Sequence, residues 1–277
     1  MNDIPPRSYG PILETTLRIV TWNVWGRHGP WQAREPAILA TLQEARPDIV
    51  VLTESWTKGD DSQCVRLADP LELPHFTFSG VPAEEDGGAL SGVAVLSRWP
   101  IRRECSLAFG AARVQFAELA GPRGPIHVYG LVMDAWWFDQ SQARQDALCD
   151  LLTHVSEAQD KQAPLIVCGD FNADPDSDEI RMLTGRTAAP VPGLSFGDAW
   201  EVAGPPTPGY TWSHRNPEAA RERLGNWRLD YILVRWAGAS PILHTDVIDG
   251  DRPDGHWPSD HLGVLVELDP AALAVGR

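Results

Sequence analysis

Short runs of apolar residues, many of them β-branched, recur along the chain, and each has the length of one β-strand. Most of these runs end at glycine, proline or aspartate, residues that interrupt strands. The pattern predicts strands over residues 17–24, 48–52, 92–99, 112–119, 126–133, 165–168, 229–235 and 262–268. Strands are therefore expected along almost the whole sequence.

Two stretches between these strands have the spacing of a helix. Residues 36–45 are expected to form a helix with Pro36 in its first turn and Pro47 just beyond its end. Over residues 142–159, the apolar side chains that recur on one helix face are Ala147, Leu148, Leu151, Leu152 and Val155. This spacing predicts an amphipathic helix with one buried face.

The order of these elements favours an α/β architecture. The later strands follow one another with less helix between them, which predicts mixed sheets covered by helices on the outside. Residues 57–88 and 184–210 fit neither pattern and are expected to be long loops. We expect one domain over residues 17–269, with a flexible tail at 1–16 and a short tail at 270–277.

Composition narrows the classes of function. The 277 residues include 38 Asp and Glu against 23 Lys and Arg, a formal charge of −15, and the only lysines are Lys58 and Lys161. Tight, sequence-independent DNA binding needs a basic surface and is therefore disfavoured, although a local arginine patch stays open. The start lacks a secretory signal, and no apolar run approaches about 20 residues. We expect a cytoplasmic protein with no membrane span.

Acidic, amide and imidazole side chains gather at the ends of the predicted strands. Those that follow an early strand are Asn23, Glu54, Asp170 and Asn172. Those that stand at the entrance of a later strand are Asp230, Asp260 and His261. If the later strands run antiparallel to the earlier ones, all of these groups converge on one rim of the fold.

Several acids on one rim repel one another unless a cation or a shared proton lies among them. Oxygen and amide ligands favour a hard ion, Mg²⁺ or Mn²⁺ before zinc, and the four cysteines lack the spacing of a zinc site. Each side chain also has a plain structural interpretation, because Asp and Asn often form turns after a strand and Asp260-His261 fits a capping pair. Glu54 is different, since a turn does not need glutamate.

Five short motifs, in order along the chain, resemble the endonuclease/exonuclease/phosphatase superfamily. They are Thr21-Trp-Asn-Val, Leu52-Thr-Glu, Gly169-Asp-Phe-Asn-Ala, Arg228-Leu-Asp-Tyr-Ile-Leu and Ser259-Asp-His. That superfamily includes DNase I, apurinic/apyrimidinic endonucleases, neutral sphingomyelinases, inositol polyphosphate phosphatases and deadenylases. The resemblance implies a single catalytic domain with the DNase I-like fold, a four-layer α/β sandwich of two packed mixed β-sheets flanked by helices, with the site at one end of the sheets.

The resemblance also implies roles for the residues of these motifs. Glu54 becomes the principal metal carboxylate, with Asn23 beside it in the metal and phosphate network and Asp260 as a further metal-side carboxylate. Asp170 orients or deprotonates the attacking water, and Asn172 hydrogen-bonds the phosphate.

His261 contacts the phosphate in this scheme, and Asp230 pairs with it, fixing its tautomer and raising its basicity. A Mg²⁺ ion and a cationic histidine would together neutralise charge on the phosphoryl oxygens as water attacks in line. Whether Asp170 or His261 takes the proton from water is left open by the motifs.

One stretch departs from the family pattern. Members commonly place a His or Tyr after the central strand, in patterns such as Asn-Thr-His-Leu, whereas this chain has Val128-Tyr-Gly-Leu-Val-Met-Asp-Ala, which puts Leu131 at that position. Tyr129, His127 or a residue of a rim loop are the candidate replacements. The alternative, which we hypothesise, is a substrate whose leaving group needs little protonation.

Three further residues are candidates for substrate contact. Trp25 and Trp212 stand in segments expected around the site and are suited to stacking a base, a sugar or a quaternary ammonium group, with ordinary core packing as the alternative. Arg144, near the start of the helix at 142–159, matches an arginine that the family often has there. We interpret Arg144 as structural, with phosphate contact as the alternative.

Together these features predict a divalent-metal-dependent phosphoesterase that cleaves a phosphodiester or phosphomonoester by direct in-line attack of water. The alternatives are a nuclease acting on DNA or RNA with the same site, and a degenerate member that binds a phosphorylated ligand or a protein without hydrolysis. The acidity favours a small or lipid-like phosphoester over duplex DNA. No obligate protein partner is evident from the pattern.

Overall fold

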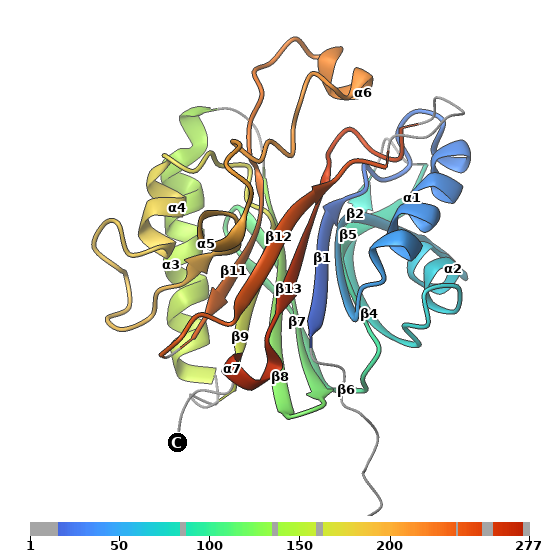
Figure 1. Cartoon of the computed structure of the whole chain (residues 1–277). Helices are drawn as coiled ribbons and strands as arrows, with labels where there is room; N and C mark the ends of the chain where they lie inside the picture. The colour runs from blue at the N-terminus through green and yellow to red at the C-terminus, as the bar shows by residue number, and fades with distance from the viewer. Residues whose placement is uncertain are drawn as a thin grey trace, which may run out of the picture.

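Two β-sheets form the centre of the molecule (Figure 1). The first sheet has the strand order β12 (Ile242–Ile248), β13 (Gly263–Leu268), β1 (Leu17–Asn23), β2 (Ile49–Lys58), β5 (Ala89–Ser97) and β4 (His75–Ala83), with β3 (Asp61–Ser62) beside β2. The second has the order β10 (Gly197–Asp198), β11 (Asp230–Arg235), β9 (Leu165–Asp170), β8 (Gly124–Met133), β7 (Ala112–Gly121) and β6 (Ile101–Phe109). The computed structural model describes residues 16–83, 87–134, 138–158, 163–236, 238–250 and 257–273.

Both sheets are mixed, as the sequence predicted. The pairs β1–β2 and β8–β9 are parallel, and the other paired strands run antiparallel. The sheets pack face to face through side chains such as Val51, Val128 and Val266, which share one buried apolar cluster.

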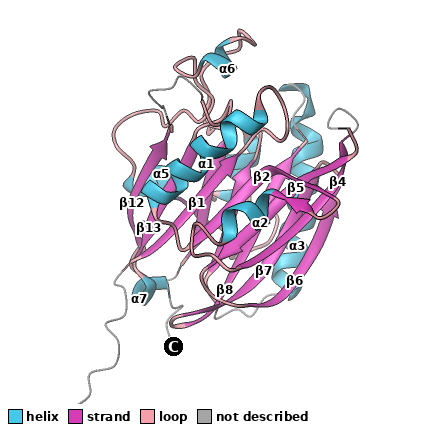
Figure 2. Ribbon diagram, turned by 90° about the vertical axis from the view of Figure 1, so that its right-hand side faces the viewer, coloured by secondary structure: helices cyan, strands magenta, loops and turns pink. Residues whose placement is uncertain are grey.

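Helices cover the outer face of each sheet and complete four layers. Helices α1 (Trp31–Ala45) and α2 (Gln63–Ala68) lie on the first sheet (Figure 2), and α3 (Ser141–Ala158) and α4 (Asp178–Leu183) lie on the second. The shorter helices are η2 (Phe138–Gln140), α5 (Ala199–Ala203), α6 (Pro217–Ala220) and α7 (Pro270–Leu273). None of the helices among the described residues is long and apolar enough to cross a lipid bilayer.

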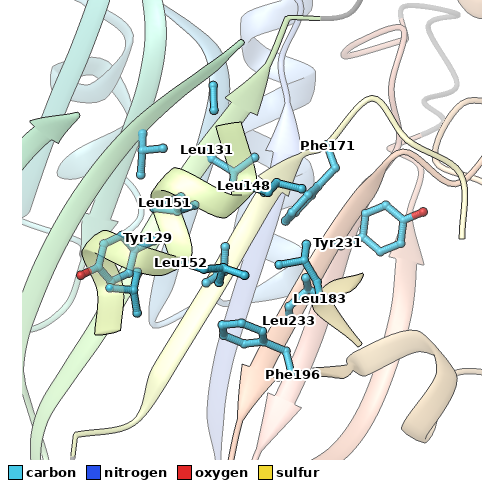
Figure 3. Packing of buried hydrophobic residues seen from close by; sticks show 14 of the residues in the cluster. Tyr129, Leu131, Leu148, Leu151, Leu152, Phe171, Leu183, Phe196, Tyr231 and Leu233 are labelled. Carbon is cyan, nitrogen blue, oxygen red and sulfur yellow. The ribbon is translucent and has the colours of Figure 1, made fainter. Parts of the chain in front are cut away.

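Helix α3 matches the predicted helix at 142–159 to within one residue at each end. Its five apolar residues are all buried against the second sheet, where side chains such as Leu148, Leu151 and Leu152 pack with strand residues (Figure 3). Helix α1, in contrast, begins at Trp31 rather than at Pro36. The amides of Ala33 and Arg34 already bond to the carbonyl of Pro30, so Pro36 lies inside the helix, where its ring removes one backbone hydrogen bond.

The sequence pattern missed the strands at the sheet edges. Strands β4, β12 and β6 each form an edge, and β4 lies inside residues 57–88, which were expected to be loop. Most residues of these edge strands are exposed or only partly buried, so the strands lack the continuous apolar run of a central strand. Residues 184–210 likewise contain β10 and α5. Both loop predictions were therefore wrong in part.

The two predicted terminal tails lie partly outside the described residues. Of the expected tail at 1–16, only Thr16 is described, and of residues 270–277, the described part forms α7 with Leu273 buried.

Strand direction brings the predicted site residues to one rim, at the top of Figure 1. Strand β1 ends at Asn23 and β9 ends at Asp170, whereas β11 begins at Asp230, directly opposite Asp170 in the antiparallel ladder. Strand β13 is antiparallel to β1 and begins just after His261. The rim therefore collects the ends of two strands and the starts of two others.

Candidate active site

Asn23 joins the two sheets at the rim. Its side-chain nitrogen donates to Glu54 Oε1 at 3.0 Å and to Asp170 Oδ2 at 2.9 Å. Glu54 comes from the first sheet and Asp170 from the second, and Asn23 and Asp170 are almost completely buried. A single amide thus fixes the separation of two carboxylates that stand 116 positions apart in the sequence.

Glu54 reaches the rim because β2 carries a bulge. Pairing with β5 shifts between Leu52 and Ser55, and Glu54 adopts a left-handed backbone with φ +54°. Such a conformation costs a non-glycine residue about 1–3 kcal/mol and persists only where the surroundings hold it. A bulge turns a side chain away from the regular alternation of the strand, so the extra residue aims the carboxylate of Glu54 at Asn23.

His261 and Asp230 form a buried pair. Nδ1 of His261 lies 2.8 Å from Asp230 Oδ2, and its Nε2 lies 4.0 Å from Asp170 Oδ2. The ring is therefore flanked by two carboxylates. Trp212 packs edge-on against it, with ring centroids 5.0 Å apart. The imidazole is held in one orientation, with Nε2 turned toward Asp170.

These charges shift one another's protonation. Burial would lower the pKa of His261, but the carboxylates of Asp230 and Asp170 overcome it and hold that pKa well above its usual value. Burial raises the pKa of Asp170 to about 7, the Asp230 charge adds to the rise, and His261 and Asn23 oppose it. The protonation states of Asp170 and His261 therefore depend on each other and on the charge of Asp230.

Asp260 lies on the other side of the rim, in a buried position. Ser259 Oγ lies 3.1 Å from its Oδ1 and 2.6 Å from the backbone oxygen of Asn23. Asn216 Nδ2 donates to the backbone oxygens of both Ser259 and Asp260. Burial raises the pKa of Asp260 to about 6, with His261 opposing the rise and the nearby charge of Glu54 adding to it. A buried carboxylate next to a second carboxylate is suited to a cation.

Asn172 follows Asp170 and supports it. Its backbone amide donates to Asp170 Oδ1 at 2.9 Å, and its side-chain nitrogen donates to the carbonyl of Met133 at 2.8 Å. Asn172 also has a left-handed backbone, with φ +47°. The residue therefore ties the end of β8 to the end of β9 beside the carboxylate.

Of the three further candidates for substrate contact, Arg144 and Trp212 are buried and contact other side chains of the protein. Arg144 is buried and its Nε donates to the buried carboxylate of Glu179 at 2.8 Å, in line with the structural interpretation. Trp212 is 6% exposed and packs on His261. Trp25 is half-buried at the rim, with the guanidinium of Arg34 4.9 Å from its ring.

Leu131 and its neighbour Val132 lie on opposite faces of β8. Leu131 is fully buried and points into the layer between the second sheet and α3, beside Leu148 (Figure 3). Side chains alternate along a strand, so the neighbour Val132 points the other way, where it packs against the cluster between the sheets and pairs with Asp170. Val132 therefore lies on the inner face of β8, opposite Asp170 in the ladder, whereas Leu131 faces α3.

Arg34 is the residue at the rim that the sequence analysis missed. It stands on α1, is 2% exposed, and donates to backbone carbonyls of the segments that carry Asn23 and Asp260. A signal was present, because Arg34 has the helical spacing of the buried residues Ile38 and Leu42 on the same helix. A charge on a buried helix face needs buried partners.

Comparison with known proteins agrees with this geometry. Residues 20–261 match the model of the Endonuclease/Exonuclease/phosphatase family. Nocturnin from Mus musculus is 30% identical over 131 residues, which are 43% of this chain and 28% of Nocturnin. The chain therefore aligns with under a third of the length of that relative.

Solved structures share the fold over nearly the whole chain. An endonuclease/exonuclease/phosphatase from Beutenbergia cavernae superimposes with a TM-score of 0.70 at 21% identity, covering 95% of this chain and 72% of that one. D. rerio TDP2, in complex with a single-strand DNA product, has a TM-score of 0.72 at 20% identity, covering 92% and 99%. Both show the DNase I-like sandwich. The chain belongs to the endonuclease/exonuclease/phosphatase family.

Proposed function

We propose that this protein hydrolyses a phosphodiester or phosphomonoester by direct in-line attack of water, with a divalent metal ion bound at the rim. One observation carries the proposal: Asn23 holds Glu54 and Asp170 at 3.0 and 2.9 Å from one nitrogen, beside the His261–Asp230 pair. A protein that only binds its ligand does not need a histidine–aspartate pair that can help to activate water beside carboxylates suited to a metal ion.

Two groups of ligand atoms are candidates for the ion. Ligand atoms of Asp170, Asp230 and His261 lie within 4.8 Å of one another. A cation among these three would displace the hydrogen bond between His261 and Asp230. Glu54 and Asp260 are the better choice for Mg²⁺ or Mn²⁺, because hard ions prefer carboxylate oxygens and these two carboxylates repel each other without a cation.

The protein's own groups supply the rest of the chemistry. Asp170 orients the attacking water and accepts its proton, since its raised pKa of about 7 suits a base at neutral pH. The protonated His261, stabilised by Asp230, donates through Nε2 to a phosphoryl oxygen. Asn23 and Asn172 hold Asp170 in position. A bound divalent ion adds positive charge against the same phosphoryl group.

The substrate class follows from charge. The chain carries a net charge of −15, which favours a small or lipid-like phosphoester over duplex DNA. A nuclease acting through the same site is the second candidate. The DNA product in the D. rerio TDP2 structure belongs to that protein, with which this chain shares 20% identity.

The test is metal-dependent release of p-nitrophenolate from bis-p-nitrophenyl phosphate and from p-nitrophenyl phosphate, with Mg²⁺, with Mn²⁺ and with chelator. Removing one metal carboxylate by Glu54→Gln should lower turnover at least about 100-fold. The matched control is Glu267→Gln, which makes the same change at a glutamate paired with Arg18 on the far end of β13. No metal-dependent turnover of any phosphoester, RNA and single-stranded DNA included, would favour a protein that binds without hydrolysis.

A further inference from the structure

A buried arginine connects the two segments that carry the proposed metal ligands. Arg34 is the fourth residue of α1 and is 2% exposed. Its two terminal nitrogens donate, at 2.6 to 3.0 Å, to the backbone carbonyls of Val24, Trp25, Gly26, His28 and Pro258. All five hydrogen bonds come from the two terminal nitrogens, while the buried Nε has no hydrogen-bond partner among the described residues.

The carbonyls come from two different parts of the chain. Four belong to the turn that directly follows Asn23, where Trp25 and Gly26 have left-handed backbones with φ +56° and +44°. The fifth, that of Pro258, stands two residues before Asp260. Arg34 Nη1 bonds to both parts at once, 2.9 Å from Val24 O and 2.6 Å from Pro258 O. A movement of either segment away from the other breaks a hydrogen bond to this nitrogen.

The charge of Arg34 also acts on the site. Burial lowers the pKa of Arg34, and Asp260, Glu218, Glu54 and Glu35 oppose the change, so the guanidinium stays protonated. Its positive charge interacts with the carboxylates of Asp260 and Glu54 and so offsets part of the repulsion between them.

We infer that Arg34 is a positioning residue that holds Asn23 and Asp260 in the metal-binding arrangement and thereby sets the affinity for the divalent ion. This inference rests on the proposed metal site. Lysine cannot take over the role, because it offers three donors from a single nitrogen, whereas the five carbonyls surround a planar fork. A purely structural arginine would affect folding stability and leave the intrinsic metal affinity of the folded protein unchanged.

The experiment measures Mn²⁺ binding by electron paramagnetic resonance in the absence of substrate, on folded protein checked by circular dichroism. Wild type and Glu54→Gln establish the metal site. Arg34→Lys should raise the Kd for Mn²⁺ about tenfold, which is about 1.4 kcal/mol. The Mn²⁺ concentration for half-maximal turnover should rise equally, while kcat at saturating Mn²⁺ stays within about twofold.

A control and a second variant keep the result interpretable. Leu152→Ala, a core change on the buried face of α3, should lower Tm and leave the Kd unchanged. Ser259→Ala removes the 2.6 Å contact with Asn23 O, a second contact between the same segments, together with the contacts of Ser259 Oγ to Asp260 Oδ1 and the amide of His261. It should raise the Kd several-fold even if Arg34→Lys fails to fold. If wild type binds no Mn²⁺, or Glu54→Gln binds it equally well, the proposed site and this inference both fall. If wild type binds Mn²⁺ and Glu54→Gln does not, the proposed site stands. An unchanged Kd in Arg34→Lys then overturns only the inference about Arg34. If Arg34→Lys does not fold, an unchanged Kd in Ser259→Ala has the same meaning.

Discussion

His261 owes its charge to its neighbours. Burial by itself would favour the neutral ring, and the carboxylates of Asp230 and Asp170 reverse that preference. The function proposed for His261 needs the cation, so activity should be lost as pH rises through its raised pKa. The proposed function therefore predicts that this pair sets the alkaline limit of activity.

Replacing Asp230 by asparagine removes the charge and keeps the size of the side chain. The pKa of His261 should fall, so the alkaline loss of activity should move to lower pH, and kcat at neutral pH should drop about 100-fold or more. The measurement is the pH profile of kcat on bis-p-nitrophenyl phosphate at saturating Mn²⁺. Asp246→Asn, at an exposed aspartate on β12, is the control. An alkaline limb that does not move would exclude His261 as the titrating cation.

Leu131 and Val132 are neighbours with opposite orientations, and a histidine at each should behave differently. Leu131→His places a polar ring in the core under α3 and should cost about 2–5 kcal/mol of unfolding free energy in urea denaturation. Val132→His, on the face of Asp170, should cost less and raise turnover of an alkyl phosphodiester more than that of an aryl one. Equal gains for both esters would contradict the idea that the native substrate has a good leaving group.

Central strands could be predicted from the sequence, whereas edge strands could not. Every residue of β9 is buried, so the strand reads as one apolar run, while most side chains of β6 are only partly buried or exposed. Most of the candidate site residues stand where buried strands end or begin, which is why the sequence pattern indicated them. Glu54 instead lies inside β2 at a bulge, which the pattern did not predict. The hydrogen bonds of Arg34 could not be predicted, because every residue has a backbone carbonyl and the sequence does not show which carbonyls an arginine contacts.

The junction of β8 and β9 depends on a glycine directly before Asp170. Gly169 has φ +141°, and a Cβ there would lie 1.8 Å from the backbone oxygen of Leu131. Gly169→Ala should therefore cost at least about 3 kcal/mol of unfolding free energy, measured by urea denaturation, or prevent folding. Gly124 is the matched control, with φ +128° and open space around its Cβ position. Similar losses in Gly169→Ala and Gly124→Ala would show that backbone strain, and not the close approach of the strands, sets the requirement for glycine.

At the scale of the whole molecule, the acidic surface should act on substrate choice before any contact at the site. Exposed arginines do stand near the rim, on the segment that carries α6 above it (Figure 1), but Arg215 pairs with Asp249 and Arg221 with Glu218. These pairs reduce the positive charge that the segment presents to a polyanion. We therefore expect the net charge of −15 to oppose the approach of nucleic acid.

Salt dependence distinguishes this repulsion from true nucleic-acid binding. With Mn²⁺ fixed and KCl varied up to about 0.15 M, where the Debye length is about 8 Å, kcat/KM for a small phosphodiester should change less than about twofold. For duplex DNA it should start lower and rise, because salt screens like charges. A protein that neutralises phosphates shows the opposite, a steep fall with salt, because releasing counterions from DNA is less favourable at a higher salt concentration. Such a fall, with duplex DNA cleaved faster than the small ester, would make the protein a nuclease, because only a basic track along the rim could outweigh a charge of −15.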